Sequence, residues 1–312
     1  MKRTHQDEKK IKAFLSRHPI ACFVRVYASK PEQVEERVKM FSELVEIINK
    51  LEEYEGIKII KQVVAIIPTN PEYEGTLDCG KTASAIRELY PDRKKVDIIE
   101  VPYGGPFAAA FNEAIFQKTN QGYKHAFIFS SEARKCINLP TILSSIHSHI
   151  EGSLYTGLAF DDLAIRVKAG HIMNTWAFLN IYEAKRVGGF NAFAEQAVNK
   201  EMQFTMTAKD SQGNKYSYPV QGCEEGPLIH ALSSIHGFCT AVIEPEGEGV
   251  WKYEPADSDE ARLKHREKII TKKVRLNSLM FRCGMDPSYI WHAQLPEYRD
   301  ERYNPDKNEM TA

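Results

Sequence analysis

The sequence predicts an α/β fold with a mainly parallel sheet and helices on both faces. Along the first 160 residues, short apolar runs rich in β-branched residues alternate with segments of helical periodicity. Parallel strands need long crossover connections, which are usually helices packed on the faces of the sheet. The chain has 312 residues, of which 43% are hydrophobic. That is enough for one large α/β domain with a sizeable core.

The predicted strands cover residues 20–28, 63–70, 96–102, 125–130 and 154–160. Each is a short apolar run bounded by turn residues. Helices are predicted between them, from about Pro31 to a terminal glycine at Gly56, over residues 82–90, after Gly105, and over residues 139–150. The first of these helices repeats apolar residues at helical spacing and follows a capping-box pattern with proline in its first turn.

From Gly170 onward, the sequence no longer alternates regularly between apolar strands and helical segments. NTWAFLNIYEAKRVGGFN, residues 174–191, predicts an extended segment, a short helix and a glycine turn. Residues 209–218 are polar and predict an exposed loop, residues 222–238 a helix behind two acids, and residues 239–245 another strand. Residues 257–283 predict a helix with a basic face. We expect one domain over residues 1–250, with a C-terminal helical extension and tail over 251–312 packed on or near it.

Composition narrows the possible partners and location. Lysine and arginine number 41, aspartate and glutamate 42, for a net charge of -1. This balance gives no sign of a nucleic-acid partner. The apolar runs are far shorter than the roughly 20 residues of a membrane span, and the charged N-terminus is unlike a signal peptide. The six cysteines lack C-x-x-C spacing and indicate free thiols. We expect a cytoplasmic protein, with peripheral attachment to a membrane left open.

GTLDCGKT, residues 75–82, matches the P-loop pattern G-x-x-x-x-G-K-[ST]. A P-loop turns directly after its strand, whereas PEYE separates this stretch from the preceding strand. Asp78 would also lie among the phosphates and repel them. We interpret the stretch as a loop ahead of a helix that begins near Thr82. A P-loop NTPase, in which Lys81 would bind phosphate, is the least favoured alternative.

His147 and His149 lie in SIHSHIEG and invite a metal-site interpretation. Residues two apart do not share a helix face. We therefore expect them to be surface or helix-end residues.

A series of motifs, in the same order, resembles the GT-A fold of nucleotide-sugar glycosyltransferases, above all the inverting family 2. FVRVYASKPEQVEERVKMF resembles the opening strand, loop and first helix, and TLDCGKTASAIREL the turn and helix after the second strand. FAAAFNEAI resembles an "A-R-N-x-G" helix, with Asn112 at the asparagine but no arginine before it. NTWAFLNIYEAKRVGGFN resembles a segment ending in a "GGF-D/N" turn, and GCEEGPLIHAL an "E-D-x-x-L" helix start. The resemblance covers roughly residues 23–245.

The resemblance implies transfer of a sugar from a nucleotide-sugar donor to a hydroxyl of a glycan or other acceptor, with inversion. Glu225 would be the base that takes the acceptor's proton, with Glu224 beside it. Two acids at a helix start also complement the helix dipole, so a purely structural role stays open. The donor would lie near Tyr27, Ala28 and Asn70, after the first two strands. Asn112 would face its diphosphate and sugar.

The resemblance also implies where the acceptor lies. Trp176, Gly188 and Gly189 would border it, because an aromatic face suits the C–H surface of a sugar and glycine allows close approach of the backbone. For Trp176, ordinary packing in the core is equally open.

The metal motif departs from the family pattern. Members carry D-x-D after the fourth strand, which holds Mg²⁺ or Mn²⁺ against the diphosphate. FIFSSEARK places Ser130 at the first acid and Glu132 at the last, and both would face the donor. Three interpretations follow: Glu132 binds metal with a histidine such as His292, cationic side chains replace the metal, or the protein binds a nucleotide sugar or glycan without catalysis. The cationic candidates are Arg134, Lys135 and residues 268–275.

Overall fold

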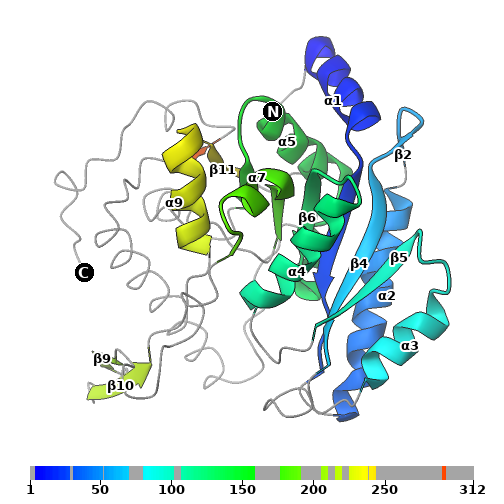
Figure 1. The fold of residues 1–312 in the computed structure, drawn as a ribbon, viewed down its shortest axis with the longest axis vertical. Helices are drawn as coiled ribbons and strands as arrows, with labels where there is room; N and C mark the ends of the chain where they lie inside the picture. Colours follow the sequence, from blue (N-terminus) through cyan, green and yellow to red (C-terminus); the bar gives the residue numbers. More distant parts are fainter. Residues whose placement is uncertain are drawn as a thin grey trace.

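An eight-stranded sheet organises the chain, in the order β12-β11-β7-β8-β6-β1-β4-β5 (Figure 1). The description rests on a computed structural model. It covers residues 4–28, 31–51, 53–69, 80–101, 107–158, 176–190, 205–209, 215–219, 225–237, 239–243 and 290–292.

The sheet is mainly parallel, which confirms the predicted fold class. Its strands are β1 (Ile20–Arg25), β4 (Ile60–Pro68), β5 (Val96–Val101), β6 (His125–Phe129), β7 (Tyr155–Leu158), β8 (Trp176–Asn180), β11 (Thr240–Ile243) and β12 (Ile290–His292). Of these, β8 runs antiparallel to both of its neighbours, β6 and β7, and the other neighbouring pairs are parallel.

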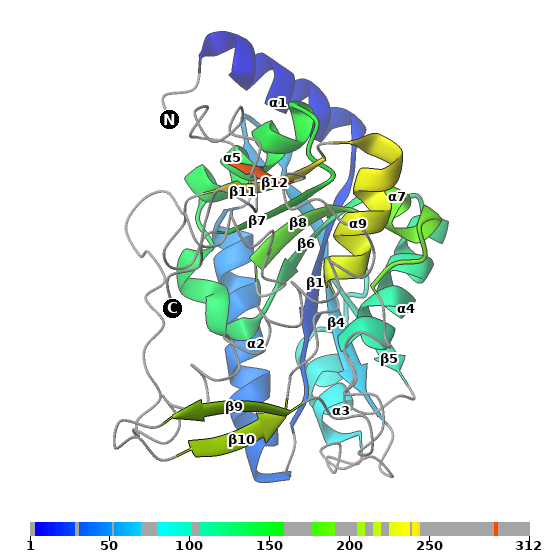
Figure 2. The same ribbon diagram turned by 90° about the vertical axis from the view of Figure 1, so that its left-hand side faces the viewer.

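Helices cover both faces of the sheet, as predicted. Figure 2 shows α2 and α5 on one side of the sheet and α4, α7 and α9 on the other. The first face packs on α1 (His5–Arg17), α2 (Val34–Lys50), α3 (Lys81–Leu89) and α5 (Leu139–Ile150), together with the 3-10 segment η2 (Ser131–Cys136). The second face packs on α4 (Phe107–Asn120), α7 (Ile181–Arg186) and α9 (Glu225–His236).

The side chains of β1 show why the sheet is buried on both sides. Cys22 and Val24 belong to the first hydrophobic cluster, and Ala21 and Phe23 belong to the second. All four are fully buried. A strand covered on both faces carries a continuous apolar run rather than an alternating one, which is the pattern in this stretch of the sequence.

Two predicted connections are wrong. The helix that starts after the 3-10 turn η1 (Pro31–Gln33) ends at Lys50, not near Gly56. Glu55 and Gly56, with φ of 49° and 78°, instead form the two-residue turn between β2 (Glu53–Tyr54) and β3 (Ile57–Lys58). Such turns need positive φ at both central residues. Within the stretch predicted to be a loop, residues 215–218 instead belong to β10 (Lys215–Pro219), which pairs with β9 (Thr205–Lys209), and residues 210–214 lie outside the described residues.

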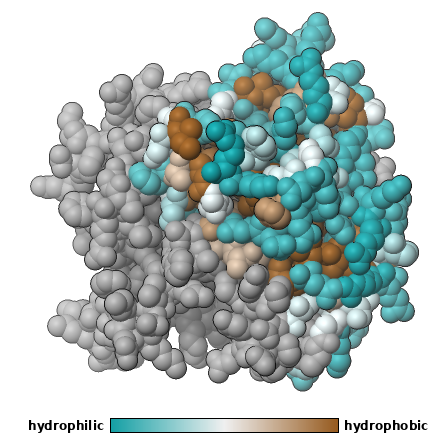
Figure 3. All heavy atoms as spheres, viewed as in Figure 1, coloured by the Kyte–Doolittle hydropathy of each residue, from teal (hydrophilic) through white to brown (hydrophobic). Residues whose placement is uncertain are grey.

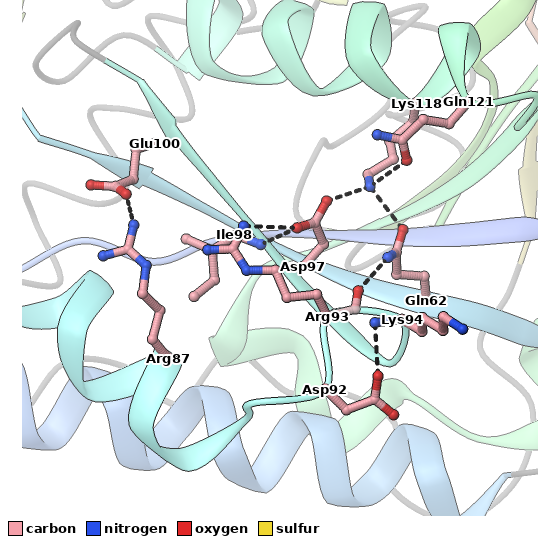
Figure 4. A network of polar contacts seen from close by, with 10 residues as sticks. All are labelled: Gln62, Arg87, Asp92, Arg93, Lys94, Asp97, Ile98, Glu100, Lys118 and Gln121. Carbon is pink, nitrogen blue, oxygen red and sulfur yellow. Dashed lines mark hydrogen bonds and ion pairs between the residues drawn. The ribbon is translucent and has the colours of Figure 1, made fainter.

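Lys118 anchors the end of α4 to the sheet (Figure 4). Its side chain is fully buried. Its Nζ donates to Oε1 of Gln62 at 2.8 Å and to Oδ2 of Asp97 at 2.6 Å. A third bond, of 2.9 Å, goes to Oε1 of Gln121. An ammonium group has three donors, so each of them has an oxygen partner, and the charge is paired with the Asp97 carboxylate.

The C-terminal part of the chain contributes to the main sheet. Residues 290–292 form β12, which pairs in parallel with β11. The rest of the predicted extension, including the basic helix at 257–283, lies outside the described residues. The proposed division at residue 250 therefore stays a prediction. No helix in the described ranges is long and apolar enough to cross a bilayer.

Candidate functional site

The strand order places a binding edge beside β1. From β1, the chain continues to β4 and β5 on one side, and then returns to β6 on the other. In open parallel sheets, ligands bind beyond the carboxyl ends of the strands where the order reverses in this way. Tyr27 and Ala28 follow the end of β1, and Ser130 follows the end of β6. These predicted donor residues thus lie at the reversal point, while Asn70 is outside the described residues.

At the end of β1, an exposed aromatic ring lies against a cation. The Tyr27 side chain is 43% exposed, and Ala28 beside it is buried. The guanidinium carbon of Arg25 lies 4.5 Å from the centre of the Tyr27 ring. Such a cation–π contact attracts the guanidinium to the face of the ring and helps to hold the ring in place. Arg25 is not among the site residues predicted from the sequence. A charged residue at the end of an otherwise apolar strand is the signal that could have identified it.

Beyond β6, Ser130 precedes η2. Its Oγ is buried and has no hydrogen-bond partner among the described residues. Glu132 lies within η2, but its side chain is not part of what the structure describes. Arg134 is occupied elsewhere: its Nε lies 3.0 Å from Oε2 of Glu43 in α2, and its guanidinium donates to the carbonyl of Ser131 at 3.0 Å. This placement argues against Arg134 as the cation that holds a diphosphate.

The strand register separates the backbone of His292 from β6, the strand that leads to Glu132, and the metal pair of Glu132 and His292 stays a prediction. Residue-by-residue pairing places His292 level with Ile128 of β6, with β11, β7 and β8 between them. Neighbouring strands lie about 4.8 Å apart, so four spacings place the backbones of His292 and Ile128 roughly 19 Å apart. Within the described ranges, no group of three or more His, Cys, Asp or Glu residues could hold a metal ion.

Glu225 begins α9, and Glu224 lies just outside the described residues. Because α9 leads into β11, which runs parallel to the other main strands, α9 starts at the carboxyl edge of the sheet. Glu225 is only 1% exposed and shares the buried face of α9 with Leu228, Ile229 and Leu232. A buried carboxylate carries a large free-energy cost unless it is paired and hydrogen-bonded. Glu225 thus combines burial with a place at the edge where the motif predicts the base.

The glycine turn is held by Asn112. The amide of Asn112 donates to the carbonyl of Phe190 at 2.8 Å, and its Oδ1 accepts from the Phe190 N–H at 2.8 Å. Gly188 and Gly189 precede Phe190 with φ of 93° and 74°. A Cβ on Gly189 would collide with the side-chain amide of Asn112. Gly189 is thus required by close approach as well as by its backbone angle.

The structure gives Trp176 a packing role. Its side chain is fully buried, and its ring lies 5.6 Å and 5.4 Å from the rings of Phe127 and Phe129. These rings belong to the first hydrophobic cluster, whereas Phe190 of the glycine turn belongs to the second, across the sheet. Trp176 therefore offers no face for an acceptor to stack on, although its Nε1 has no partner among the described residues.

The P-loop lookalike can be followed from Gly80 onward. Gly80, with φ of 77°, caps α3, whose first residue is the exposed Lys81. The start of α3 therefore agrees with the interpretation of GTLDCGKT as a loop ahead of a helix that begins near Thr82. Residues 75–79 lie outside the described residues.

Comparisons with known proteins give structural likeness only. No family model matches the sequence, and no curated protein matches it. A glucosyl-3-phosphoglycerate synthase from Mycobacterium tuberculosis, in complex with Mn²⁺, UDP-glucose and phosphoglyceric acid, is similar at 11% identity and a TM-score of 0.48. The match covers 88% of this chain and 86% of that chain.

A second solved structure is a mannosyltransferase from Pyrobaculum calidifontis in complex with GDP-mannose and Mn²⁺. It is 12% identical with a TM-score of 0.37, over 61% of this chain and 57% of that chain.

Proposed function

We propose that the protein transfers a sugar from a nucleotide-sugar donor to an acceptor hydroxyl, with inversion. The donor would lie at the reversal point beside β1, against Tyr27 and Ala28, with Asn70, Ser130 and Glu132 nearer its diphosphate. The acceptor would approach past the turn formed by Gly188, Gly189 and Phe190. Sequence motifs, burial and strand order support this assignment from independent directions.

The contact between Asn112 and Phe190 carries the proposal. These residues are 78 positions apart, and each lies in a motif that resembles glycosyltransferases: the FAAAFNEAI helix and the GGFN turn. Both polar atoms of the Asn112 amide are used in this contact. Asn112 would therefore hold the acceptor turn, and the second N–H of its amide and the second acceptor site of its Oδ1 would remain for a bond to the donor.

Glu225 would supply the base. As the acceptor oxygen attacks the anomeric carbon, the carboxylate would take its proton. A bond forms between that oxygen and the anomeric carbon, and the bond to the diphosphate breaks on the opposite face. The electron pair of the broken bond leaves with the nucleoside diphosphate, so the configuration inverts. Glu224 would lie beside the base.

Ligand binding is the first test. Thermal unfolding would be measured with UDP-glucose, GDP-mannose, a dTDP-sugar, ATP and GTP, each with and without Mn²⁺. A ligand that binds only the folded state raises the midpoint. We expect a rise with one sugar nucleotide, and a larger rise with Mn²⁺ would assign it as a cofactor. A rise with ATP or GTP alone would contradict the proposal and favour a P-loop.

Replacing the base separates catalysis from binding. Glu225→Gln should keep the midpoint rise with the donor but lower the rate of sugar release or transfer by at least about a hundredfold, the usual contribution of a general base. Glu8→Gln is the matched control, because Glu8 is also an acid in the first turn of a helix and α1 lies away from the edge. Equal rates for Glu225→Gln and the unchanged chain would rule out Glu225 as the base.

One observation favours a second function, binding of a nucleotide sugar or glycan without catalysis. By the resemblance, Ser130 stands where the family carries the first metal-binding acid, so the motif FSSE has one acid fewer than D-x-D. A binder would show the same midpoint rise with no turnover, and Glu225→Gln would change neither.

A further inference from the structure

Three histidines meet at the edge of the sheet opposite the candidate site. His18 follows α1, His125 begins β6, and His149 lies near the end of α5. The ring of His125 lies 5.2 Å from that of His18 and 4.6 Å from that of His149. We call His18, His125 and His149 the imidazole cluster.

Phe14 of α1 packs into the imidazole cluster. Its ring lies 4.8 Å from the ring of His18, 4.9 Å from that of His125 and 5.3 Å from that of His149. Phe178 of β8 lies behind the last two, at 6.0 Å and 5.5 Å. The imidazoles thus lie in an aromatic contact that fastens α1 to the body of the protein.

The surroundings of the imidazole cluster oppose positive charge. Burial, with His149, His18 and Lys124 nearby, lowers the pKa of His125 to about 2. Burial and His18 lower the pKa of His149 to about 4, although a hydrogen bond with the Ser153 backbone acts in the other direction. Burial, Lys124 and Arg17 lower the pKa of His18. His125 is 3% exposed, and its Nδ1 has no hydrogen-bond partner among the described residues.

Other charged groups of α1 lie further along the same interface. Asp7 lies 3.2 Å from His147 of α5, Lys10 lies 3.1 Å from Glu151 after α5, and Lys12 lies 2.9 Å from Glu55 in the β2–β3 turn. These pairs are partly exposed, and each carboxylate already has a partner. These ion pairs contact α1 away from the imidazole cluster, and none of them places a carboxylate against the three imidazoles.

We propose that α1 is an acid-released latch, which stays docked while the imidazole cluster is neutral and leaves the sheet when the cluster takes up protons. Release of α1 hydrates all three imidazoles without unfolding the sheet. It exposes only Phe14, Ile11, Leu15 and their partners. The device therefore acts in mildly acidic solution, below the ordinary pKa of histidine near 6.5.

The size of the effect follows from linkage. A group that binds its proton only after release shifts the equilibrium tenfold for every pH unit below its free pKa. At pH 5, two histidines that stay neutral while docked, His125 and His149, together favour release by roughly a hundredfold or more relative to pH 7.5. His18 adds to this shift.

Hydrogen exchange of the full chain tests the latch. Deuterium uptake would be followed at pH 7.5 and pH 5.0 and corrected for the intrinsic pH dependence of exchange. We expect amides of α1 to lose protection by about a hundredfold or more at pH 5.0, reversibly, while those of β1 and β4 stay protected. Equal protection of α1 at both pH values would overturn the proposal, as would joint loss in α1, β1 and β4.

Two variants sharpen the measurement. His125→Phe keeps an aromatic ring that cannot be protonated, and should reduce the pH dependence of α1 protection by at least about tenfold. His5→Gln is the control, since the His5 side chain is 81% exposed, and should leave the dependence unchanged. If His125→Phe does not fold, the comparison of hydrogen exchange in the unchanged chain at pH 7.5 and pH 5.0 tests the proposal by itself. A His125→Phe protein with the full pH dependence would count against the imidazole cluster.

Discussion

Two adjacent glycines with nearly the same backbone conformation allow one substitution to serve as control for the other. Gly188 and Gly189 both have positive φ, but a Cβ on Gly188 would meet nothing within 4 Å. A Cβ on Gly189 would strike the amide of Asn112. The free-energy cost of a non-glycine residue with positive φ can therefore be measured separately from the cost of the clash with Asn112.

We predict that Gly188→Ala lowers the free energy of unfolding by about 1–2 kcal/mol, the cost of a left-handed non-glycine residue. Gly189→Ala should cost roughly 1–3 kcal/mol more, because it also overpacks the contact. Urea denaturation gives both values.

The role of Asn112 can be tested by a double-mutant cycle. Asn112→Ala should cost about 1–3 kcal/mol, because it leaves the N–H and carbonyl of the buried Phe190 without partners. In that background, Gly189→Ala should cost no more than Gly188→Ala, since the clash is gone. Strict additivity of Asn112→Ala and Gly189→Ala would show that the close approach does not exist in solution.

At the scale of the element, α4 is held at two points. Asn112 joins it to the glycine turn, and Lys118 joins it to β4 and β5. The second anchor contains a buried cation, so its contribution depends on the carboxylate that faces it. Removing one member of such a pair leaves the other charge buried and uncompensated.

We predict that Asp97→Asn lowers the free energy of unfolding by about 3–5 kcal/mol, because it leaves the Lys118 ammonium without its counter-charge. Glu100→Gln is a matched control in the same strand: Glu100 pairs with Arg87, and its side chain is 38% exposed. Such a surface pair contributes about 0–1 kcal/mol. Urea midpoints compare the two, and equal losses would contradict the role assigned to Lys118.

The sequence predicts elements better than it predicts their contacts. The apolar runs locate β1, β4, β5 and β6 because strands buried on both faces must be apolar throughout. The direction of β8 could not be predicted, because hydrophobic periodicity does not record strand direction. His149 lies in the last turn of α5, which agrees with the predicted helix-end position, but helix periodicity gives no hint of the ring of His125 that packs against it.

The candidate site is predicted in the same uneven way. Tyr27, Ala28, Ser130 and Glu225 lie at the carboxyl edge because the edge follows from strand order. Trp176 is in the core, since a residue at the start of a strand can face either side of a sheet. Asn112 lies beside the glycine turn through a contact between residues 78 positions apart, which no local pattern contains.

At the scale of the whole molecule, the ionisable groups set a pH range of greatest stability. His125 and His149 have pKa values lowered to about 2 and about 4. Both stay neutral while α1 is docked, whereas the unfolded chain takes up protons below about pH 6.5, so stability falls as the pH falls. Burial raises the pKa values of Cys22 and Tyr123, so stability also falls once the unfolded chain loses these protons.

We therefore predict that the free energy of unfolding is nearly constant from about pH 7 to about pH 8.5 and decreases on either side. Between pH 6.5 and pH 4, the decrease should approach about 1.4 kcal/mol per pH unit for each histidine that remains neutral in the folded protein. Urea unfolding at a series of pH values checks this. A maximum near pH 5 would mean that the imidazole cluster is protonated in the folded protein.

The antiparallel strand in the middle of the sheet has a consequence for synthesis on the ribosome. The strands β1, β4, β5 and β6 are complete once residue 129 has emerged, and they are neighbours in the sheet. The next strand to be made, β7, has no place beside them until β8 arrives to lie between β6 and β7. Until then the nascent protein carries an open strand edge on β6, where another chain could pair. A pause in translation between residues 130 and 175 would prolong that exposure and is the point at which a chaperone would protect the growing chain most.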